Sequence, residues 1–535
     1  MNRSLKRPLT LFLLLTLLLL TGCTKISDGL SLSVCTGGKP ESLDPIHATD
    51  PGEQTILNHL YENLMRVTAD ASGRTSVTNG MAKSVDMEEE TVEGGVAVTY
   101  TFRLRTARWS DGQAVKASDF VYAWQRLADP ANNSPYAGLL SCVSGFSEAR
   151  ETGDMSLLQV SAKNDSTLIV VLNGRHDWFL KEVCTAPAAM PLRRDAVETQ
   201  SGSWSDDPTA FVTNGPYAAV ESGDTLRLEQ NDRYYADLSG PRTITFHFAA
   251  AAEDAQALYE SKTVDVVWPA AEDAGIWLPA LETSAVVFNC AAEPFSDVLL
   301  RRALSLSIDR NALAEAAGTL VKPAEGVIPS GVPESEEGDF RTTGGPLLDN
   351  DPDAYAEACA QAKTLIQEAG YNSGEDLGEL EYLYVKSEEN DAVAELLCRQ
   401  WQEVLDVQAT PKPLSEAALS AALQSGEYAL AGLNLTASAN DAECYLSNWI
   451  SSDAGNVARY KSTAYDTLMS VIASAGDGAA RMGCLHDAEE LLLMDYALAP
   501  LCNSGSVWAM RDTLTGAIRD PRGWFTFSGV FTRST

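Results

Sequence analysis

Two kinds of hydrophobic periodicity follow each other along this chain of 535 residues, and their order limits the folds it can adopt. Alternating apolar and polar residues, the pattern of half-buried strands, occupy residues 97–105, 166–174, 225–231 and 242–249. Helical periods follow at 297–318, 351–371, 390–408 and 478–500. Strands therefore dominate the first half and helices enrich the second, which indicates an α/β protein. The length predicts more than one domain or lobe.

The stretch RWSDGQAVKASDFVYAWQRLADP (residues 108–130) predicts a turn followed by a helix. The SDG tripeptide is a turn signal after a strand, and Ser118 is the candidate N-cap of the helix. The helix must end before Pro130, because proline restricts the residue that precedes it. Three large side chains fall at i, i+4 and i+7 and are expected in the core: Phe120, Trp124 and Leu127.

The segment from 331 to 352 is polar and rich in glycine and proline, which predicts a loop. We do not expect it to be a long linker that separates independent domains.

The chain is strongly acidic, since 74 aspartates and glutamates against 39 lysines and arginines give a formal net charge of −35. An acidic protein repels nucleic acid and anionic lipid headgroups, so we expect no nucleic-acid partner. The simplest consequence of this charge is solubility.

The first 23 residues have the features of an export signal. A basic start is followed by a leucine-rich segment, Leu9–Leu20, that is too short to span a bilayer comfortably. It ends in Leu-Thr-Gly-Cys, which resembles the lipobox of bacterial lipoproteins, in which the cysteine is diacylated and becomes the first residue. We therefore expect residues 1–22 to be removed and a lipid on Cys23 to hold the protein at a membrane surface. The alternative is a plain signal peptide with a chance cysteine.

Patterns for catalysis or metal binding are missing from the sequence. It contains no GxSxG, HExxH, GxGxxG or P-loop motif, and none of its five histidines is spaced as a metal pair. Its ten cysteines include no CxxC pair, which argues against a zinc site or a disulfide framework. One or two disulfides stay open in an exported protein. We therefore expect a binding protein rather than an enzyme, with no cofactor and no metal site.

The chain resembles the large extracytoplasmic solute-binding proteins of ABC importers, in the oligopeptide-binding (peptide/nickel) family. Five blocks carry the resemblance, in the family's order, and together they span nearly the whole mature chain. They are ESLDP with LYENL (41–45, 60–64), the stretch 108–130, VTNGPY with LRLEQNDRYY (212–217, 226–235), PFSDVLLRRALSLSIDR (294–310) and ARYKSTAYDTLM (458–469).

The resemblance implies an α/β fold with two lobes that close on a solute, the periplasmic-binding-protein or Venus flytrap fold, with an extra domain inserted in lobe one. The expected division is 23–65, 212–285 and 504–535 for lobe one, 66–211 for the extra domain and 286–503 for lobe two. The stretch 108–130 then belongs to the scaffold of the extra domain and does not bind the solute.

The resemblance also implies which residues bind the solute. The lobe-one contacts are expected at Glu53, Gln54, Thr55 and Ile56, and those of lobe two at Leu435, Thr436, Ala437, Ser438, Ala439 and Asn440. Peptide-binding relatives carry an aspartate in the second segment that pairs with the α-amino group of the peptide, and Ser438 occupies that position here. Asp441 and Glu443 are candidates to replace it, and the alternative is that both face solvent.

The function implied by the resemblance is the capture of oligopeptides by lobe closure and their delivery to an ABC permease and ATPase complex. We expect a monomer, lipid-anchored on the extracytoplasmic face of the cell membrane, on the periplasmic side if two membranes are present. Two alternatives stay open. One is a binder of a non-peptide solute, such as a glycan or a metal chelate, and the other is a surface sensor with the same fold.

Overall fold

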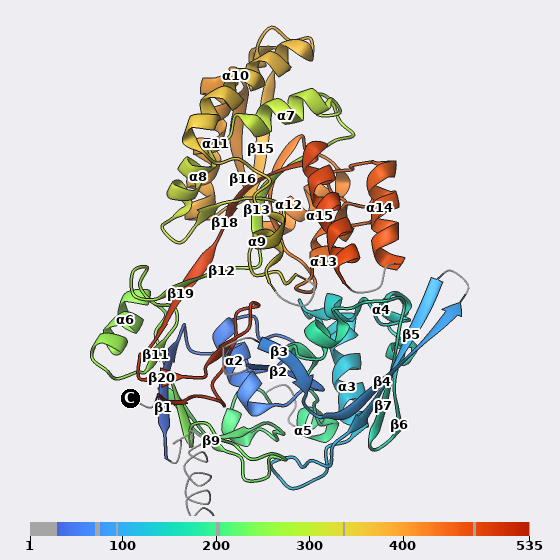
Figure 1. The fold of residues 1–535 in the computed structure, drawn as a ribbon, viewed down its shortest axis with the longest axis vertical. Coiled ribbons are helices and arrows are strands. Elements are labelled where there is room, and N and C mark those ends of the chain that lie inside the picture. Colours follow the sequence, from blue (N-terminus) through green and yellow to red (C-terminus); the bar gives the residue numbers. More distant parts are fainter. Residues whose placement is uncertain are drawn as a thin grey trace, which may run out of the picture.

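The computed structural model describes residues 29–69, 75–92, 95–199, 204–334, 338–474 and 478–533. The expected signal peptide and the lipidation site at Cys23 lie outside these residues. Figure 1 shows two bodies stacked along the longest axis of the molecule, with the first half of the chain in the lower body and most of the second half in the upper. We call the lower body lobe one with its extra domain, and the upper body lobe two.

Lobe one is built on a seven-stranded sheet with the order β12-β19-β11-β1-β10-β9-β8. β1 pairs in parallel with β10 and β11, and the remaining pairs are antiparallel. Helices α2 (Pro51–Leu60) and α6 (Ala252–Glu260) pack against it. The strands are β1 (Ser31–Thr36), β8 (Tyr217–Ser222), β9 (Thr225–Gln230), β10 (Thr243–Phe248), β11 (Val266–Val267), β12 (Ile276–Pro279) and β19 (Gly505–Met510).

The extra domain contributes a four-stranded antiparallel sheet, β4-β5-β7-β6, and a separate hairpin. Helix α3 (Ala117–Ala128) packs on this sheet, with α4 (Phe146–Thr152) and α5 (Arg194–Glu198) nearby. One hydrophobic core runs from Leu32 of β1 to Phe102 of β5, so lobe one and the extra domain share their interior. The strands are β2 (Met65–Ala69), β3 (Thr75–Asn79), β4 (Ala82–Val92), β5 (Gly95–Leu104), β6 (Val160–Asn164) and β7 (Thr167–Leu172).

Lobe two holds a six-stranded sheet with the order β14-β18-β13-β17-β15-β16, covered by helices on both faces. Successive residues of β13 point into different cores, since Ala285 and Val287 belong to one cluster and Val286 and Phe288 to another. The strands are β13 (Thr283–Phe288), β14 (Lys322–Pro323), β15 (Glu379–Val385), β16 (Gln408–Leu414), β17 (Leu430–Leu435) and β18 (Leu498–Asn503).

The helices of lobe two fall into two groups that follow these cores. The first group contributes to the cluster around Phe288 and consists of α7 (Val298–Leu306), α8 (Arg310–Ala317), α10 (Pro352–Glu368) and α11 (Glu388–Leu405). The second contributes to the cluster around Val287 and consists of α9 (Phe340–Gly344), α12 (Glu416–Ser425), α13 (Ala442–Leu446), α14 (Thr463–Ser474) and α15 (Ala479–Met494).

Two neighbouring strands carry the chain between the lobes. The outward crossing connects β12 to β13 and the return crossing connects β18 to β19, and β12 pairs with β19. The Ala280 amide donates to the Ser504 carbonyl at 2.9 Å, and the Ser504 hydroxyl donates to Glu282 Oε1 at 2.8 Å. The crossings therefore form one short two-stranded hinge. Four small strands complete the C-terminal segment of lobe one: β20 (Leu514–Thr515), β21 (Ile518–Arg519), β22 (Phe525–Thr526) and β23 (Phe531–Thr532).

The strands predicted from alternation are confirmed, whereas the bounds of several helices differ. The predicted helix 297–318 is two helices, because Asp309 caps a second one by accepting from the Ala312 amide at 3.1 Å. The predicted helix 478–500 ends at Met494, and its last residues belong to the buried strand β18. The helix after residue 108 begins one residue before Ser118, with Lys116 at the N-cap, and it ends before Pro130 as predicted.

Two further differences concern the second half. The predicted loop 331–352 contains the short helix α9, which starts at the N-cap Asp339. Strand β13 begins at Thr283, so residues 283–285, which the sequence assigned to lobe one, pair within the sheet of lobe two.

Candidate functional site: a cavity between the lobes

A cavity of about 250 Å³ lies where lobe one, the extra domain and lobe two meet. It has a largely apolar wall and a few polar groups, which is the usual make-up of a small-molecule or peptide site. Its lining from lobe one and the extra domain is Thr49, Pro51, Gln54, Tyr136, Leu139, Glu182, Ala186, Pro187, Ala188, Arg522 and Trp524. Its lining from the first crossing and lobe two is Leu281, Ala437, Ser438, Ala439, Asn440 and Tyr445.

Helix α2 brings one predicted site residue into this cavity. Asp50 and Glu53 form a capping box at the start of the helix. In this box the Glu53 carboxylate accepts a hydrogen bond from the backbone amide of Asp50. Thr55 and Ile56 are buried on the other side, and the Thr55 hydroxyl accepts from the Phe525 amide. Gln54 lines the cavity, and its side-chain amide donates to Tyr136 Oη at 2.6 Å.

The segment after β17 forms the lobe-two wall of the cavity. Leu435 is still paired with Thr283 in the sheet, and Thr436 is exposed. The residues from Ala437 to Asn440 line the cavity. Within the part of the chain that the structure describes, the backbone N–H and C=O groups of Ala437 and Ser438 have no hydrogen-bond partner. These groups are available to a bound solute.

Asp441 and Glu443 do not line the cavity, because both turn to a buried arginine. Arg481 Nη2 lies 2.7 Å from Asp441 Oδ1 and 2.7 Å from Glu443 Oε2. The Arg481 side chain is 2% exposed. Burial raises the pKa of the Glu443 carboxyl even though Arg481 opposes this effect. A ligand amine would therefore have to compete with Arg481 for either carboxylate, and neither carboxylate faces solvent freely.

A carboxylate that the sequence analysis missed lines the cavity instead. Glu182 is buried, and its Oε2 accepts from the Asn440 amide at 3.0 Å and lies 3.1 Å from Arg522 Nη1. Arg522 in turn donates two hydrogen bonds of 2.7 Å to the carboxylate of Asp520. Burial raises the pKa of Glu182 to about 7, against the opposing effect of Arg522. Glu182 therefore links the extra domain to lobe two through Asn440.

The local fold that presents Glu182 is a π-helical turn, Phe179–Val183. Such turns carry one extra residue, which changes the direction of the side chains that follow, and they are frequent at functional sites. The sequence FLKEV, within an apolar stretch, does not predict a π-helical turn. The sequence analysis therefore had no pattern that indicated Glu182.

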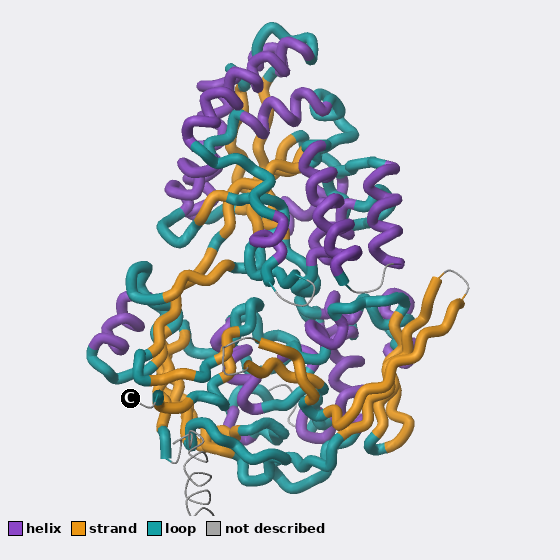
Figure 2. Tube along the Cα trace, viewed as in Figure 1, coloured by secondary structure: helices purple, strands orange, loops and turns teal. Residues whose placement is uncertain are grey.

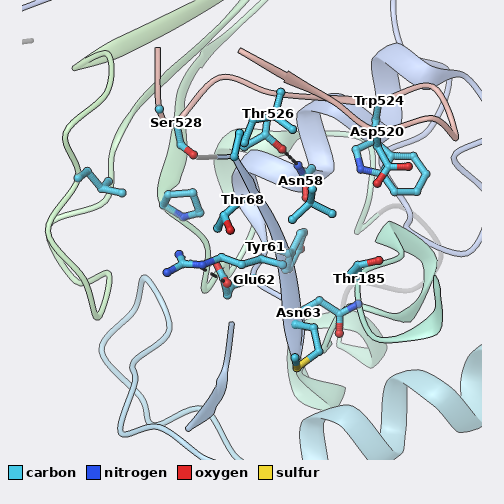
Figure 3. A pocket seen from close by; sticks show the side chains of 18 of the residues that line it. Asn58, Tyr61, Glu62, Asn63, Thr68, Thr185, Asp520, Trp524, Thr526 and Ser528 are labelled. Atoms are coloured by element: carbon cyan, nitrogen blue, oxygen red, sulfur yellow. Dashed lines mark hydrogen bonds and ion pairs between the residues drawn. The ribbon is translucent and has the colours of Figure 1, made fainter. Parts of the chain in front are cut away.

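A second cavity, of about 280 Å³, lies within the lower body, away from lobe two (Figure 3). Several of its polar groups bond to one another. The buried Glu62 carboxylate accepts from the Tyr234 hydroxyl at 2.6 Å, and Asn58 donates to Thr526 Oγ1 at 2.6 Å. Burial raises the pKa of Glu62, with Arg66 acting against it. These contacts tie α2 to the C-terminal segment of lobe one, which is a structural role.

Comparison with protein families shows which proteins share this architecture. Residues 78–456 match the model of the middle region of bacterial extracellular solute-binding proteins, family 5. The chain belongs to this family. The match covers well over half of the chain and includes most of the extra domain and much of lobe two. Of the residues that line the interlobe cavity, it leaves out Thr49, Pro51, Gln54, Arg522 and Trp524.

Curated relatives match over most of their length. The probable deoxycholate-binding periplasmic protein YgiS of Escherichia coli is 27% identical over 86% of this chain and 86% of its own. The periplasmic oligopeptide-binding protein OppA of Escherichia coli is 28% identical over 87% of this chain and 85% of its own. The dipeptide-binding protein DppE of Bacillus subtilis is 24% identical over 94% of this chain and 91% of its own.

Solved structures of peptide-binding proteins confirm the two-lobed fold. The murein tripeptide-binding protein MppA in its unliganded open form superposes with a TM-score of 0.76 at 24% identity, over 95% of this chain and 98% of that one. Haemophilus influenzae OppA in complex with the peptide RPPGFSPFR superposes with a TM-score of 0.68 at 24% identity, over 95% of this chain and 99% of that one.

Three further observations concern the described residues alone. None of their helices has the length and apolar character needed to cross a membrane. Their nine cysteines are free thiols. They contain no group of three histidine, cysteine or acidic side chains placed to hold a metal ion.

Proposed function

We propose that this family 5 protein captures short peptides between its lobes and delivers them to an ABC permease and ATPase complex. The observation that carries the proposal concerns Ala437 and Ser438, which line the interlobe cavity and whose backbone N–H and C=O groups have no hydrogen-bond partner among the described residues. An extended peptide satisfies such groups by adding itself as a strand, whatever its side chains are. The oligopeptide-binding relatives support the same solute class.

The hinge between the lobes supports capture by closure. Both crossings are single short segments that pair with each other, so lobe two can rotate about them without breaking a sheet. A peptide that contacts Gln54 on one side and Ser438 on the other gains both sets of contacts only in the closed form. The bound peptide therefore shifts the equilibrium toward closure.

The division of the chain and its location belong to the same proposal. We propose lobe one, the extra domain and lobe two with the bounds predicted from the sequence, with the boundary after the first crossing moved to residue 282 because β13 starts at Thr283. The protein is proposed to act as a monomer, held at the extracytoplasmic face of the membrane by a lipid on Cys23. Its role is binding, without catalysis, cofactor or metal.

Native mass spectrometry of the mature domain, purified without denaturation, tests the proposal. The expected result is a ladder of mixed short-peptide masses released from the protein. Ala437→Trp fills the cavity and should abolish the ladder, whereas Ala421→Trp, on the exposed side of α12, is the matched control and should retain it. A single non-peptide mass, such as that of deoxycholate, would overturn peptide capture.

A further inference from the structure

Lobe two packs directly against the extra domain beside the interlobe cavity. Ala439 and Cys444 belong to lobe two, but both are buried in the hydrophobic cluster that forms the core of lobe one and the extra domain. Next to them, the Asn440 backbone amide donates to Glu182 Oε2 at 3.0 Å. Asn440 and Glu182 are 5% and 6% exposed. This hydrogen bond therefore joins two buried groups from bodies that the hinge allows to separate.

Glu182 shares its counter-ion with a second carboxylate. Arg522 Nη1 lies 3.1 Å from Glu182 Oε2, but Arg522 also donates two hydrogen bonds of 2.7 Å to the Asp520 carboxylate. The side chains of Glu182 and Asp520 are only 8% and 5% exposed. One guanidinium thus faces two buried carboxylates. Such an arrangement favours the protonation of one of them.

Three titratable groups of lobe two also act on Glu182. Asp441 tends to raise the pKa of the Glu182 carboxyl, although Asp441 itself bonds to Arg481 at 2.7 Å. Cys444 and Tyr445 of helix α13 are neutral, because burial raises the pKa of both side chains. The lobe-two groups that act on Glu182 are therefore acidic or neutral, and they do not stabilise its negative charge.

Opening and closing the lobes gives Glu182 two different surroundings. Rotation of lobe two about the hinge breaks the contact with Asn440 and admits water to the carboxylate. Closure removes that water, and desolvation disfavours the charged form of a carboxyl group. With the lobes in contact, as in the structure, burial raises the pKa of Glu182 to about 7. A molecule that closes below this pH therefore takes up a proton from the solvent.

We propose that Glu182 couples the closure of the lobes, and with it the binding of solute, to the uptake of one proton from solvent. This proposal rests on the proposed function, because it names a regulation of the interlobe site. The proton adds to the Glu182 carboxylate, and no bond between Glu182 and the solute is required. The protein therefore binds its solute more tightly in mildly acidic surroundings and releases it more readily near neutral pH.

Calorimetric titration with trialanine tests the coupling. The free termini of this peptide titrate near about 3.5 and 8, so its charge changes little between about pH 5 and 7. The wild type, freed of resident solutes by unfolding and refolding, should lose affinity as the pH rises from about 5 to 7, by at most about tenfold per pH unit for one coupled proton. At about pH 6, titrations in buffers of different ionisation enthalpy should show uptake of up to one proton per bound peptide.

Two variants and a matched control connect the proton to Glu182. Glu182→Gln should bind with an affinity that does not depend on pH and without proton uptake. Asp520→Asn should move the pH dependence to lower pH, because Arg522 then serves the Glu182 carboxylate alone. The control is Glu148→Gln, which removes the same charge from an exposed position on α4 of the extra domain and should behave as the wild type.

Three results would overturn the coupling: wild-type affinity without pH dependence or proton uptake, proton release on binding, or uptake that persists in Glu182→Gln. If Glu182→Gln does not fold, the wild type and Asp520→Asn still decide the question. Failure of both trialanine and a mixed tripeptide pool to bind at every pH would instead overturn peptide capture itself. The failure of the coupling and the failure of the proposed function are therefore distinguishable.

Discussion

Replacing Arg481 with methionine removes a buried cation from two carboxylates. Asp441 and Glu443 each bond to Arg481 at 2.7 Å, and their side chains are only 9% and 16% exposed. Removing one partner of a buried pair leaves an uncompensated charge, which costs about 3–5 kcal/mol of unfolding free energy. This corresponds to a fall in the folding equilibrium constant of roughly a hundredfold to several thousandfold.

The assay for this change is guanidinium unfolding followed by fluorescence of the ten tryptophans. The cost should shrink as the pH is lowered, because without Arg481 the carboxylates are easier to protonate in the folded state than in the unfolded state. The triple variant Arg481→Met, Asp441→Asn, Glu443→Gln should recover most of the loss. Lys461→Met, at an exposed cation, should stay within about 0.5 kcal/mol of the wild type. A loss below about 1 kcal/mol at pH 8 would refute the assignment of a buried charge cluster.

Three further changes test other parts of the structure. Burial raises the pKa of Glu182 from 4.5 in the unfolded chain to about 7, so the wild type should lose stability as the pH rises from 4.5 to about 7. Glu182→Gln should not show this loss. Unfolding titrations at several pH values will show whether the two curves diverge. Arg341→Met should lower the unfolding free energy by about 3–5 kcal/mol, since it leaves the fully buried Glu489 without its ion pair; full stability of the single variant would contradict this. Gly505→Ala should destabilise the protein by about 1–3 kcal/mol, because a Cβ at this hinge position meets the ring of Trp277; an unchanged fluorescence spectrum and midpoint would argue against the contact.

Much of the fold was predictable because it depends on local patterns. Alternation placed β5, β7, β9 and β10 within a few residues, and the apolar spacing placed Phe120, Trp124 and Leu127 in the core. The break between α7 and α8 was missed because the apolar face continues across it, while the cap that starts the second helix is a single aspartate. Strand β18 was read as helix because a strand buried on both faces has no alternation.

The candidate site was less predictable, since its residues meet only through tertiary contacts. The resemblance indicated the segment at Ser438, and the structure places it on the cavity wall. Glu182 lies more than 250 residues before Asn440 and Arg522 in the sequence. Its contacts with them depend on a π-turn that no sequence pattern predicts. Arg481 lies about forty positions from the carboxylates that it pairs with, so the sequence offered no reason to remove them from the list of amine partners.

The paired crossings have a consequence for the order in which the exported chain acquires its structure. All strands of the lobe-two sheet lie between Thr283 and Asn503, so that sheet is complete once residue 503 has emerged. The lobe-one sheet still lacks β19 at that moment, although its first strand emerged more than 450 residues earlier. β19 occupies an interior position in that sheet, between β12 and β11. The first lobe to begin is therefore the last to close its sheet, and until then its unpaired β11 and β12 edges are exposed to other chains.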